Sequence, residues 1–317
     1  MRKTYKKQKV YKCKKYKSNK NSRALHKTKT IRRNKNRKIT GGSLIGQGNF
    51  GCAFRPELTA KTGTTHDKNI VSKVVLKNNA FSEYRHEYKI LKKMRDLDPK
   101  GLFHSLLIDA FELKNEHIPS DFTQCSLTRP TYKTDEFFVF NIAFSGSHNL
   151  TYYLKHVFSR QKDIKTIPEP GLLFSLLTNI IIGIKKMIDG NILHKTLDTD
   201  SVFLNEPVSL VNPYCAKIID YGDGELRKYK GYGDKNQDYI TFFKSIISML
   251  SRVIKTQQRN VLHDNVIQNL IHGFTQLLTM VEKNNVSYNE VIKSYILLLE
   301  HTFGKKYAEY AKSKYKF

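Results

Sequence analysis

The sequence predicts an α+β fold in which a strand-rich first third precedes a helix-rich remainder. Its 317 residues are 39% hydrophobic and include 18 Tyr and 18 Phe, which is enough apolar material for a sizeable core. Alternating and β-branched segments concentrate before residue 143, and after residue 238 the apolar residues follow helical spacing throughout. The sequence contains no internal repeat, so we expect two segregated parts.

Residues 1–40 are expected to form a disordered, solvated basic arm. They hold 18 of the 55 Lys and Arg residues and no Asp or Glu, which leaves a net charge of +9 on residues 41–317 out of the total of +27. For the basic cluster at 31–38, nuclear import or polyanion binding and a plain solubilising tail both remain open. Three interleaved tyrosines, Tyr5, Tyr11 and Tyr16, favour contact with nucleic acid through stacking.

The first third is expected to hold one helix and several strands. Residues 82–96 have helical spacing, with Tyr84, Tyr88, Leu91 and Met94 along one stripe. A strand is expected to begin at 43–45 before a glycine-rich turn, and further strands are expected at 70–76, 106–113 and 137–143.

The remainder is expected to be mostly helical. Residues 171–189 are apolar on nearly all sides and predict a central, buried helix. Short strands are expected at 202–204 and 216–219, and further helices at 238–255, 262–282, 287–302 and 304–315.

The four cysteines predict an intracellular protein with reduced thiols. Cys13, Cys52, Cys125 and Cys215 form no CxxC pair and no Cys/His cluster with zinc-like spacing. The longest apolar stretch, 172–184, contains polar residues and is too short to span a bilayer, and the charged N-terminus lacks the apolar core of a secretory signal. No membrane association is expected.

Three features of the first third suggest phosphate chemistry. Residues 46–51, Gly-Gln-Gly-Asn-Phe-Gly, form a glycine-rich turn that can bring backbone N–H groups close to phosphate oxygens. Lys73 lies within an alternating strand, where a cation is expected to face an anionic group. Glu87 on the following helix can pair with Lys73 and orient it, and Glu83, one turn earlier, is the competing partner.

Two later segments suggest the rest of a site. A loop from His194 to Ser201 follows the buried helix, and Asp220 leaves a short buried strand ahead of Tyr221 and Gly222. An Asp in that position suits a metal-binding carboxylate.

In this order, the segments resemble the signature set of the protein kinase superfamily, in a divergent serine/threonine-kinase-like form. The resemblance runs from about residue 43 to 255, and residues 51–58 with 72–74 also resemble the divergent kinases of large nucleocytoplasmic DNA viruses. It implies a two-lobed fold with a strand-rich N-lobe at 41–143 and a helical C-lobe at 144–317. It implies an intracellular location, which for a viral protein means the host cytoplasm, the nucleus or the virion.

The resemblance also implies a site for ATP and Mg²⁺. Lys73 matches the lysine that holds the α- and β-phosphates, Asp220 matches the magnesium ligand, and Asp238 matches the buried Asp that braces the catalytic loop. Residues 140–143 resemble the hinge that binds adenine, with Phe140 near the gatekeeper place. The implied nucleotide-binding residues are Ile45, Gly46, Gly48, Gly51, Ala53, Lys73, Glu87, Phe140 and Ile142.

The catalytic loop departs from the family pattern. Thr196 stands where the substrate-positioning Asp belongs, and Thr cannot accept a hydroxyl proton as a carboxylate can. Ser201 stands at the second magnesium ligand. Asp198 is the candidate substitute base, while a slipped register would use Asp200 and Asn205 instead.

The segment that presents a substrate also differs, because only 17 residues separate Asp220 from Asp238 and no Ala-Pro-Glu triplet occurs. Three functions remain open: an atypical serine/threonine kinase acting on a protein substrate, a pseudokinase that scaffolds a partner protein, and a nucleic-acid-associated protein that binds through residues 1–40.

Overall fold

The structure is a computed structural model. It describes residues 42–47, 51–58, 67–77, 83–114, 125, 136–159, 170–205, 216–226, 235–256, 261–283, 286–306, 308–309 and 312. The contacts of the chain separate residues 1–35 from residues 36–317, and all described residues belong to the second unit. The predicted basic arm at 1–40 therefore lies outside the described residues.

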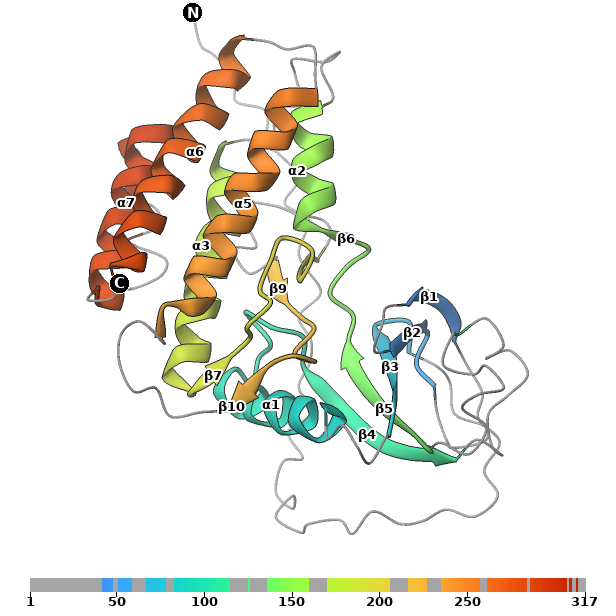
Figure 1. Ribbon diagram of the computed structural model, residues 1–317. Coiled ribbons are helices and arrows are strands. Elements are labelled where there is room, and N and C mark those ends of the chain that lie inside the picture. The colour runs from blue at the N-terminus through green and yellow to red at the C-terminus, as the bar shows by residue number, and fades with distance from the viewer. Residues whose placement is uncertain are drawn as a thin grey trace, which may run out of the picture. The chain divides into compact units, whose positions relative to one another are not determined.

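An antiparallel sheet of five strands forms the first part of the described chain (Figure 1). Its spatial order is β1-β2-β3-β5-β4. Strand β5 therefore lies between β3 and β4, although β4 precedes it in the sequence. The strands are β1 Ser43–Gln47, β2 Gly51–Arg55, β3 Ile70–Leu76, β4 Leu107–Lys114 and β5 Glu136–Ala143.

Helix α1, Glu83–Leu97, packs on one face of this sheet. The rings of Tyr84 and Tyr88 lie 5.1 and 5.8 Å from the ring of Phe138 on β5. The helix forms because its apolar residues recur every three or four positions, and burial of that stripe stabilises it against the sheet.

A smaller apolar cluster covers the opposite face of the sheet and contains a disulfide between Cys52 and Cys125. The prediction of reduced thiols is therefore wrong for these two cysteines. They lie 73 positions apart in the sequence, and spacing alone gave no sign that β2 and residue 125 meet.

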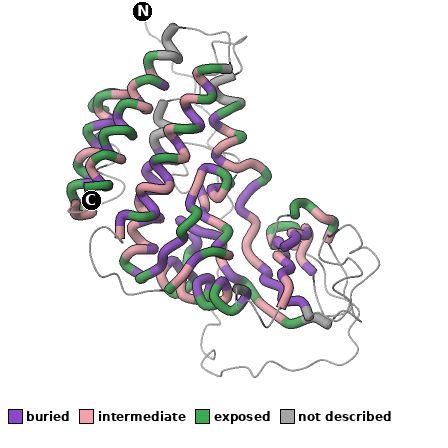
Figure 2. The backbone as a smooth tube through the Cα atoms, in the orientation of Figure 1, coloured by how far each residue is buried: buried purple, intermediate pink, exposed green. Residues whose placement is uncertain are grey.

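The second part of the chain is mainly helical. Figure 2 shows buried backbone along the inner helices, and α3 carries many of the fully buried side chains. The helices are α2 Leu150–Ser159, α3 Pro170–Asp189, α5 Gln237–Thr256, α6 Val261–Glu282 and α7 Tyr288–Phe303. None of the helices in the described segments combines the length and apolarity that crossing a membrane requires.

Short strands lie beside these helices. β6 His148–Asn149, β8 Val202–Leu204 and β9 Ala216–Ile218 form one small sheet, and β7 Ile192–Leu193 pairs with β10 Glu225–Leu226. Each of these pairs is antiparallel.

The predicted α+β class is confirmed, and most predicted elements end within about two residues of their observed limits. Helix α2 was missed. Its sequence signal is short. Asn149 accepts a hydrogen bond from the backbone N–H of Tyr152 at 2.8 Å and so caps the helix, and among the α2 side chains whose burial is described, Leu150 and Leu154 are the fully buried ones. For the helix predicted at 304–315, the structure describes only part of the range, where residues 305, 306, 308, 309 and 312 are helical.

Candidate functional site

Lys73 joins three elements that are distant in the sequence. Its Nζ lies 2.8 Å from Oε1 of Glu87 on α1 and 2.7 Å from Oδ1 of Asp220, which follows β9. The side chain of Glu87 is 5% exposed and that of Asp220 is 64% exposed. The predicted pairing of Lys73 with Glu87 is confirmed, whereas the side chain of Glu83 lies outside the described residues.

The charges of this cluster stabilise one another. Burial alone would lower the pKa of Lys73, but the carboxylates of Glu87 and Asp220 outweigh it and raise the pKa above its ordinary value. The Lys73 ammonium is the main cause of a lowered pKa at Asp220, which burial opposes. Lys73 and Asp220 are therefore both charged near neutral pH, and the exposed edge of the cluster is the Asp220 carboxylate.

The sheet places the other predicted nucleotide-binding side chains on the face of Lys73. Lys73 lies directly opposite Ala53 on β2 and Phe140 on β5, and opposite residues of paired strands share a face. Ile142, two positions beyond Phe140, shares that face because side chains alternate along a strand. Gly46 pairs with Ala53 from β1, so these five residues line one side of the sheet.

Two glycines of the predicted loop have different surroundings. A Cβ added at Gly46 would meet nothing within 4 Å, whereas one at Gly51 would lie 2.7 Å from the carbonyl oxygen of Val74. Gly51 therefore lets β2 approach β3, which is a structural reason for glycine there. Ile45 is 51% exposed, and Gly48 lies outside the described residues.

The turn that follows β9 holds Asp220 against Lys73. Asp220 adopts a positive φ of 64°, which is costly for a residue other than glycine and clusters at functional sites in proteins. A Cβ added at Gly222 would lie 3.7 Å from Oδ1 of Asp220 and 3.9 Å from Nζ of Lys73. Tyr221 between them is buried, and its ring lies 5.0 Å from the ring of His194.

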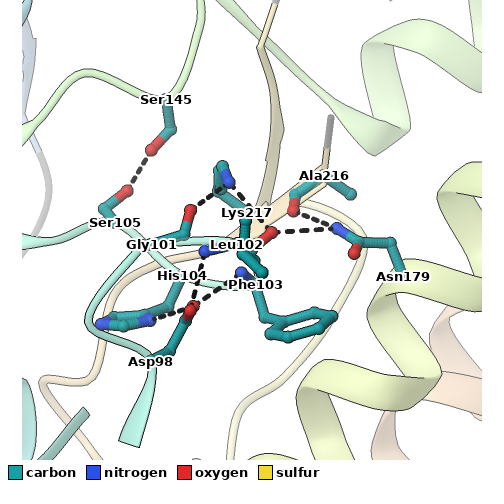
Figure 3. Close-up of polar contacts among 10 residues, drawn as sticks. All are labelled: Asp98, Gly101, Leu102, Phe103, His104, Ser105, Ser145, Asn179, Ala216 and Lys217. Atoms are coloured by element: carbon teal, nitrogen blue, oxygen red, sulfur yellow. Dashed lines mark hydrogen bonds and ion pairs between the residues drawn. The ribbon is translucent and has the colours of Figure 1, made fainter. Parts of the chain in front are cut away.

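A polar network fixes the connection from α1 to β4 (Figure 3). The buried carboxylate of Asp98 accepts hydrogen bonds from the backbone N–H of Leu102 at 2.9 Å and of Phe103 at 2.7 Å, and from Nδ1 of His104 at 2.9 Å. Burial alone would raise the pKa of Asp98, but these hydrogen bonds outweigh it and lower the pKa below its ordinary value. No pattern in the sequence indicates this network.

The same connection is bonded to β9, the strand that leads to Asp220. The N–H of Ile218 donates to the carbonyl oxygen of Phe103 at 2.9 Å, and Nζ of Lys217 donates to that of Leu102 at 2.9 Å. Asn179 on α3 donates to the carbonyl oxygen of Ala216 at 2.6 Å (Figure 3). Asp98 therefore links the end of α1, which carries Glu87, to the strand that places Asp220.

The loop at 194–201 is anchored through its backbone. The buried carboxylate of Asp238 on α5 accepts hydrogen bonds from the N–H of His194 at 2.9 Å and of Lys195 at 3.0 Å. His194 Nε2 lies 2.8 Å from the carbonyl oxygen of Ile219, next to Asp220. The predicted bracing of this loop by Asp238 is confirmed.

Thr196 and Asp198 in this loop differ in their contacts. Thr196 is exposed, and Oδ1 of Asp198 accepts hydrogen bonds from the N–H of Asp200 at 2.9 Å and from the N–H and hydroxyl of Ser201 at 2.8 Å each. One carboxylate oxygen of Asp198 therefore closes the turn. Within the described segments, its second oxygen has no hydrogen bond.

The slipped register receives no structural support. It would displace residues 202–204 from a strand, yet Val202–Leu204 is strand β8 and Asn205 follows that strand. The Asp200 carboxylate accepts a hydrogen bond from Asn149 at 2.7 Å.

No group of three or more His, Cys, Asp or Glu side chains in the described residues could by itself hold a metal ion. Two hollows of about 370 and 350 Å³ run along α6, the first also lined by α7, and neither includes Lys73, Glu87 or Asp220. Comparison of the sequence with models of protein families finds no match, and comparison with curated proteins finds none either.

Proposed function

We propose that this chain binds a magnesium nucleotide, ATP, at Lys73, Glu87 and Asp220. The observation that carries the proposal is the double ion pair of Lys73, 2.8 Å from Glu87 and 2.7 Å from Asp220. It joins a strand, a helix and a turn that lie up to 147 positions apart in the chain. The Asp220 carboxylate is 64% exposed while Lys73 beside it is 19% exposed, so a ligand can reach the carboxylate from solvent.

The proposal includes a kinase-like, two-lobed arrangement. The five-stranded sheet with α1 is the N-lobe, and α2, α3 and the helices that follow are the C-lobe. Residues 140–143 at the end of β5 are the hinge, with Phe140 at the gatekeeper position. The order of Lys73, Glu87, the loop at 194–201 and Asp220 supports this arrangement.

Each residue of the cluster has a distinct task in nucleotide binding. Lys73 donates to phosphate oxygens and neutralises part of their charge, and Glu87 keeps the ammonium pointed toward them. Asp220 offers carboxylate oxygens to Mg²⁺, with Ser201 as a second oxygen donor. Mg²⁺ is commonly held by one or two carboxylates together with substrate phosphates and water, so this small donor set fits it.

The same geometry supports phosphate transfer less well. Thr196 is exposed but has no carboxylate, and one oxygen of Asp198 is occupied within its own turn. Loss of a positioned base typically costs about 10²–10⁴ in rate. Slow transfer to a serine or threonine hydroxyl is the second candidate function, because the remaining oxygen of Asp198 is still able to accept a proton.

Thermal unfolding with and without Mg-ATP tests nucleotide binding. At about 100 times Kd, a ligand that binds only the folded state adds about 2.7 kcal/mol, which raises Tm by about 5–10 °C in a domain of this size. Lys73→Ala and Asp220→Asn should abolish the shift. Lys77→Ala is the matched control, since Lys77 directly follows the same strand and pairs with Glu112 of β4 at 3.0 Å. No shift in the wild type contradicts the proposal.

Transfer of the labelled γ-phosphate to the chain or to a general protein substrate separates the two candidate functions. Binding without transfer supports a nucleotide-binding scaffold. Transfer that is lost in Asp198→Asn and retained in Asp200→Asn supports Asp198 as the base.

A further inference from the structure

Helix α1 presents a second charged surface on the side that faces away from the sheet. Its residues Arg85, Lys89, Lys92 and Arg95 are exposed and Lys93 is half-buried. We call these five residues the basic face of α1. Figure 2 shows exposed and buried stretches alternating along this helix, and Glu87 and the apolar stripe are among its buried residues.

The cations of this face have no carboxylate partner among the described side chains. Elsewhere in the described chain, several lysines pair with neighbouring acids: Lys185 with Asp189, Lys244 with Glu282 at 2.9 Å, and Lys305 with Glu309 at 3.9 Å. Asp96 lies one helical turn from Lys92 and is the exposed acid among the described side chains of α1, and no ion pair in the described chain joins it to these cations. The face therefore keeps a large positive excess.

The spacing of these cations suits a row of phosphates. A rise of about 1.5 Å per residue places Arg85 and Arg95 about 15 Å apart along the helix axis, with Lys89 and Lys92 between them on the same side. A rigid rod of cations at intervals of about 5–6 Å can contact several phosphates of one backbone without rearranging.

The face offers little for bases or for a hydrophobic partner. Tyr84 is 7% exposed and accepts a hydrogen bond from Nε of Arg85 at 2.8 Å, and Tyr88 is half-buried against Phe138. The tyrosines of α1 therefore provide no stacking platform for unpaired bases, and His86 is the one ring that the described part of α1 exposes. None of the exposed large hydrophobic side chains in the described residues belongs to α1. A protein interface normally needs such an apolar anchor.

From this combination we propose that the basic face of α1 binds the phosphate backbone of double-stranded nucleic acid. Binding is independent of sequence, because the contacts are to phosphates and carry no base information. This surface is separate from the basic arm at 1–40. It also does not depend on nucleotide binding at Lys73, which lies on the opposite side of the helix.

The test uses the full-length chain and a fluorescein-labelled 24-base-pair DNA duplex, with affinity measured by anisotropy at several KCl concentrations. The variant Arg85→Gln/Lys89→Gln/Lys92→Gln removes three charges while keeping good helix formers. The matched control, Lys255→Gln/Lys293→Gln/Lys306→Gln, removes three exposed charges from α5, α7 and the segment after α7. Thermal unfolding confirms that both variants are folded.

Each phosphate contact contributes about 0.9 to the slope of log K against log salt. The α1 variant should lower the slope by about 2–3 and weaken binding by about tenfold or more, while the control stays near the wild type. The arm contributes equally to all three proteins, so the difference isolates α1. Lys73→Ala should bind the duplex as the wild type does, which separates this proposal from that for the nucleotide site.

Three outcomes would overturn the proposal. Equal slopes of log K against log salt in the α1 variant and the control would show that the effect depends on the net charge of the chain and not on the position of the cations on α1. A larger loss for a 24-nucleotide single strand than for the duplex would point to unpaired nucleic acid. Loss of binding to labelled poly-glutamate, with duplex binding unchanged, would assign the face to an acidic protein instead.

Discussion

Replacing Asp98 with Asn tests how strongly the connection from α1 to β4 is held. The carboxylate is buried and accepts three hydrogen bonds, from Leu102, Phe103 and His104. An amide has one acceptor oxygen, so at least one donor loses its partner, which costs about 1.5–3 kcal/mol for a bond to a charged group. The other two bonds become neutral and each weakens by about 1 kcal/mol. We expect a loss of about 3–5 kcal/mol in the free energy of unfolding.

Urea denaturation measures this loss, with Asp189→Asn as the control. Asp189 is 48% exposed and pairs with Lys185 one helical turn away, so its removal should cost less than about 1 kcal/mol. A loss below about 1 kcal/mol in Asp98→Asn would refute the assignment of Asp98 as a structural acceptor.

The pH dependence gives a second check on Asp98. Its pKa is lower in the folded state than its ordinary value of 3.8, so the unfolded state binds the proton more tightly. The stabilisation is therefore complete well above pH 3.8 and is lost as the pH falls through the lowered pKa. The stability difference between the wild type and Asp98→Asn should be constant near neutral pH and shrink below pH 3.8. A difference that grows on acidification would contradict this sign.

Three further predictions concern other parts of the chain. Thr196→Asp should raise the rate of γ-phosphate transfer by about 10²-fold or more, measured with labelled ATP, and an unchanged rate would count against the kinase resemblance of this loop. Gly146→Ala should lower Tm strongly, because Gly146 has a φ of 117° and an added Cβ would lie 1.7 Å from the carbonyl oxygen of Leu204; Gly46→Ala, with open space around its Cβ, should change Tm little. Cys52→Ser should cost about 2–4 kcal/mol in urea denaturation, and dithiothreitol should destabilise the wild type but not this variant.

The spacing of hydrophobic residues and the residue types predicted the long, well-buried elements. Helix α3 is apolar nearly all round, and β3 is rich in β-branched residues, so both were found within one residue. The short strands β6, β7 and β10 have two residues each, which is too few for any period to be visible.

The site was predictable where the charge of the side chains and their order along the sequence indicate the same interaction. A lysine in a β-branched strand, followed by a glutamate on a helix, predicts an ion pair from residue types alone, and Lys73 and Glu87 form it. The Asp98 network was not predictable in this way, because its partners are mainly backbone N–H groups, which every residue carries. Its contact with Lys217 is made to the carbonyl oxygen of Leu102, 115 positions away in the chain. The disulfide between Cys52 and Cys125 was missed because a contact over 73 positions depends on tertiary packing.

The anchoring of the loop at 194–201 bears directly on how its altered side chain should be interpreted. Asp238 holds the N–H groups of His194 and Lys195, and His194 in turn contacts the carbonyl of Ile219, so none of these contacts uses the side chain at position 196. The turn that follows is closed by Asp198 and Ser201, again without the side chain of Thr196, whose backbone carbonyl accepts a hydrogen bond from the Ser201 hydroxyl at 3.4 Å. The backbone conformation is therefore set by residues on either side, and a carboxylate placed at 196 would be held by a loop that is already ordered. A gain of transfer in Thr196→Asp would show that the side chain at position 196 limits the transfer rate, whereas an unchanged rate would count against the kinase resemblance of this loop.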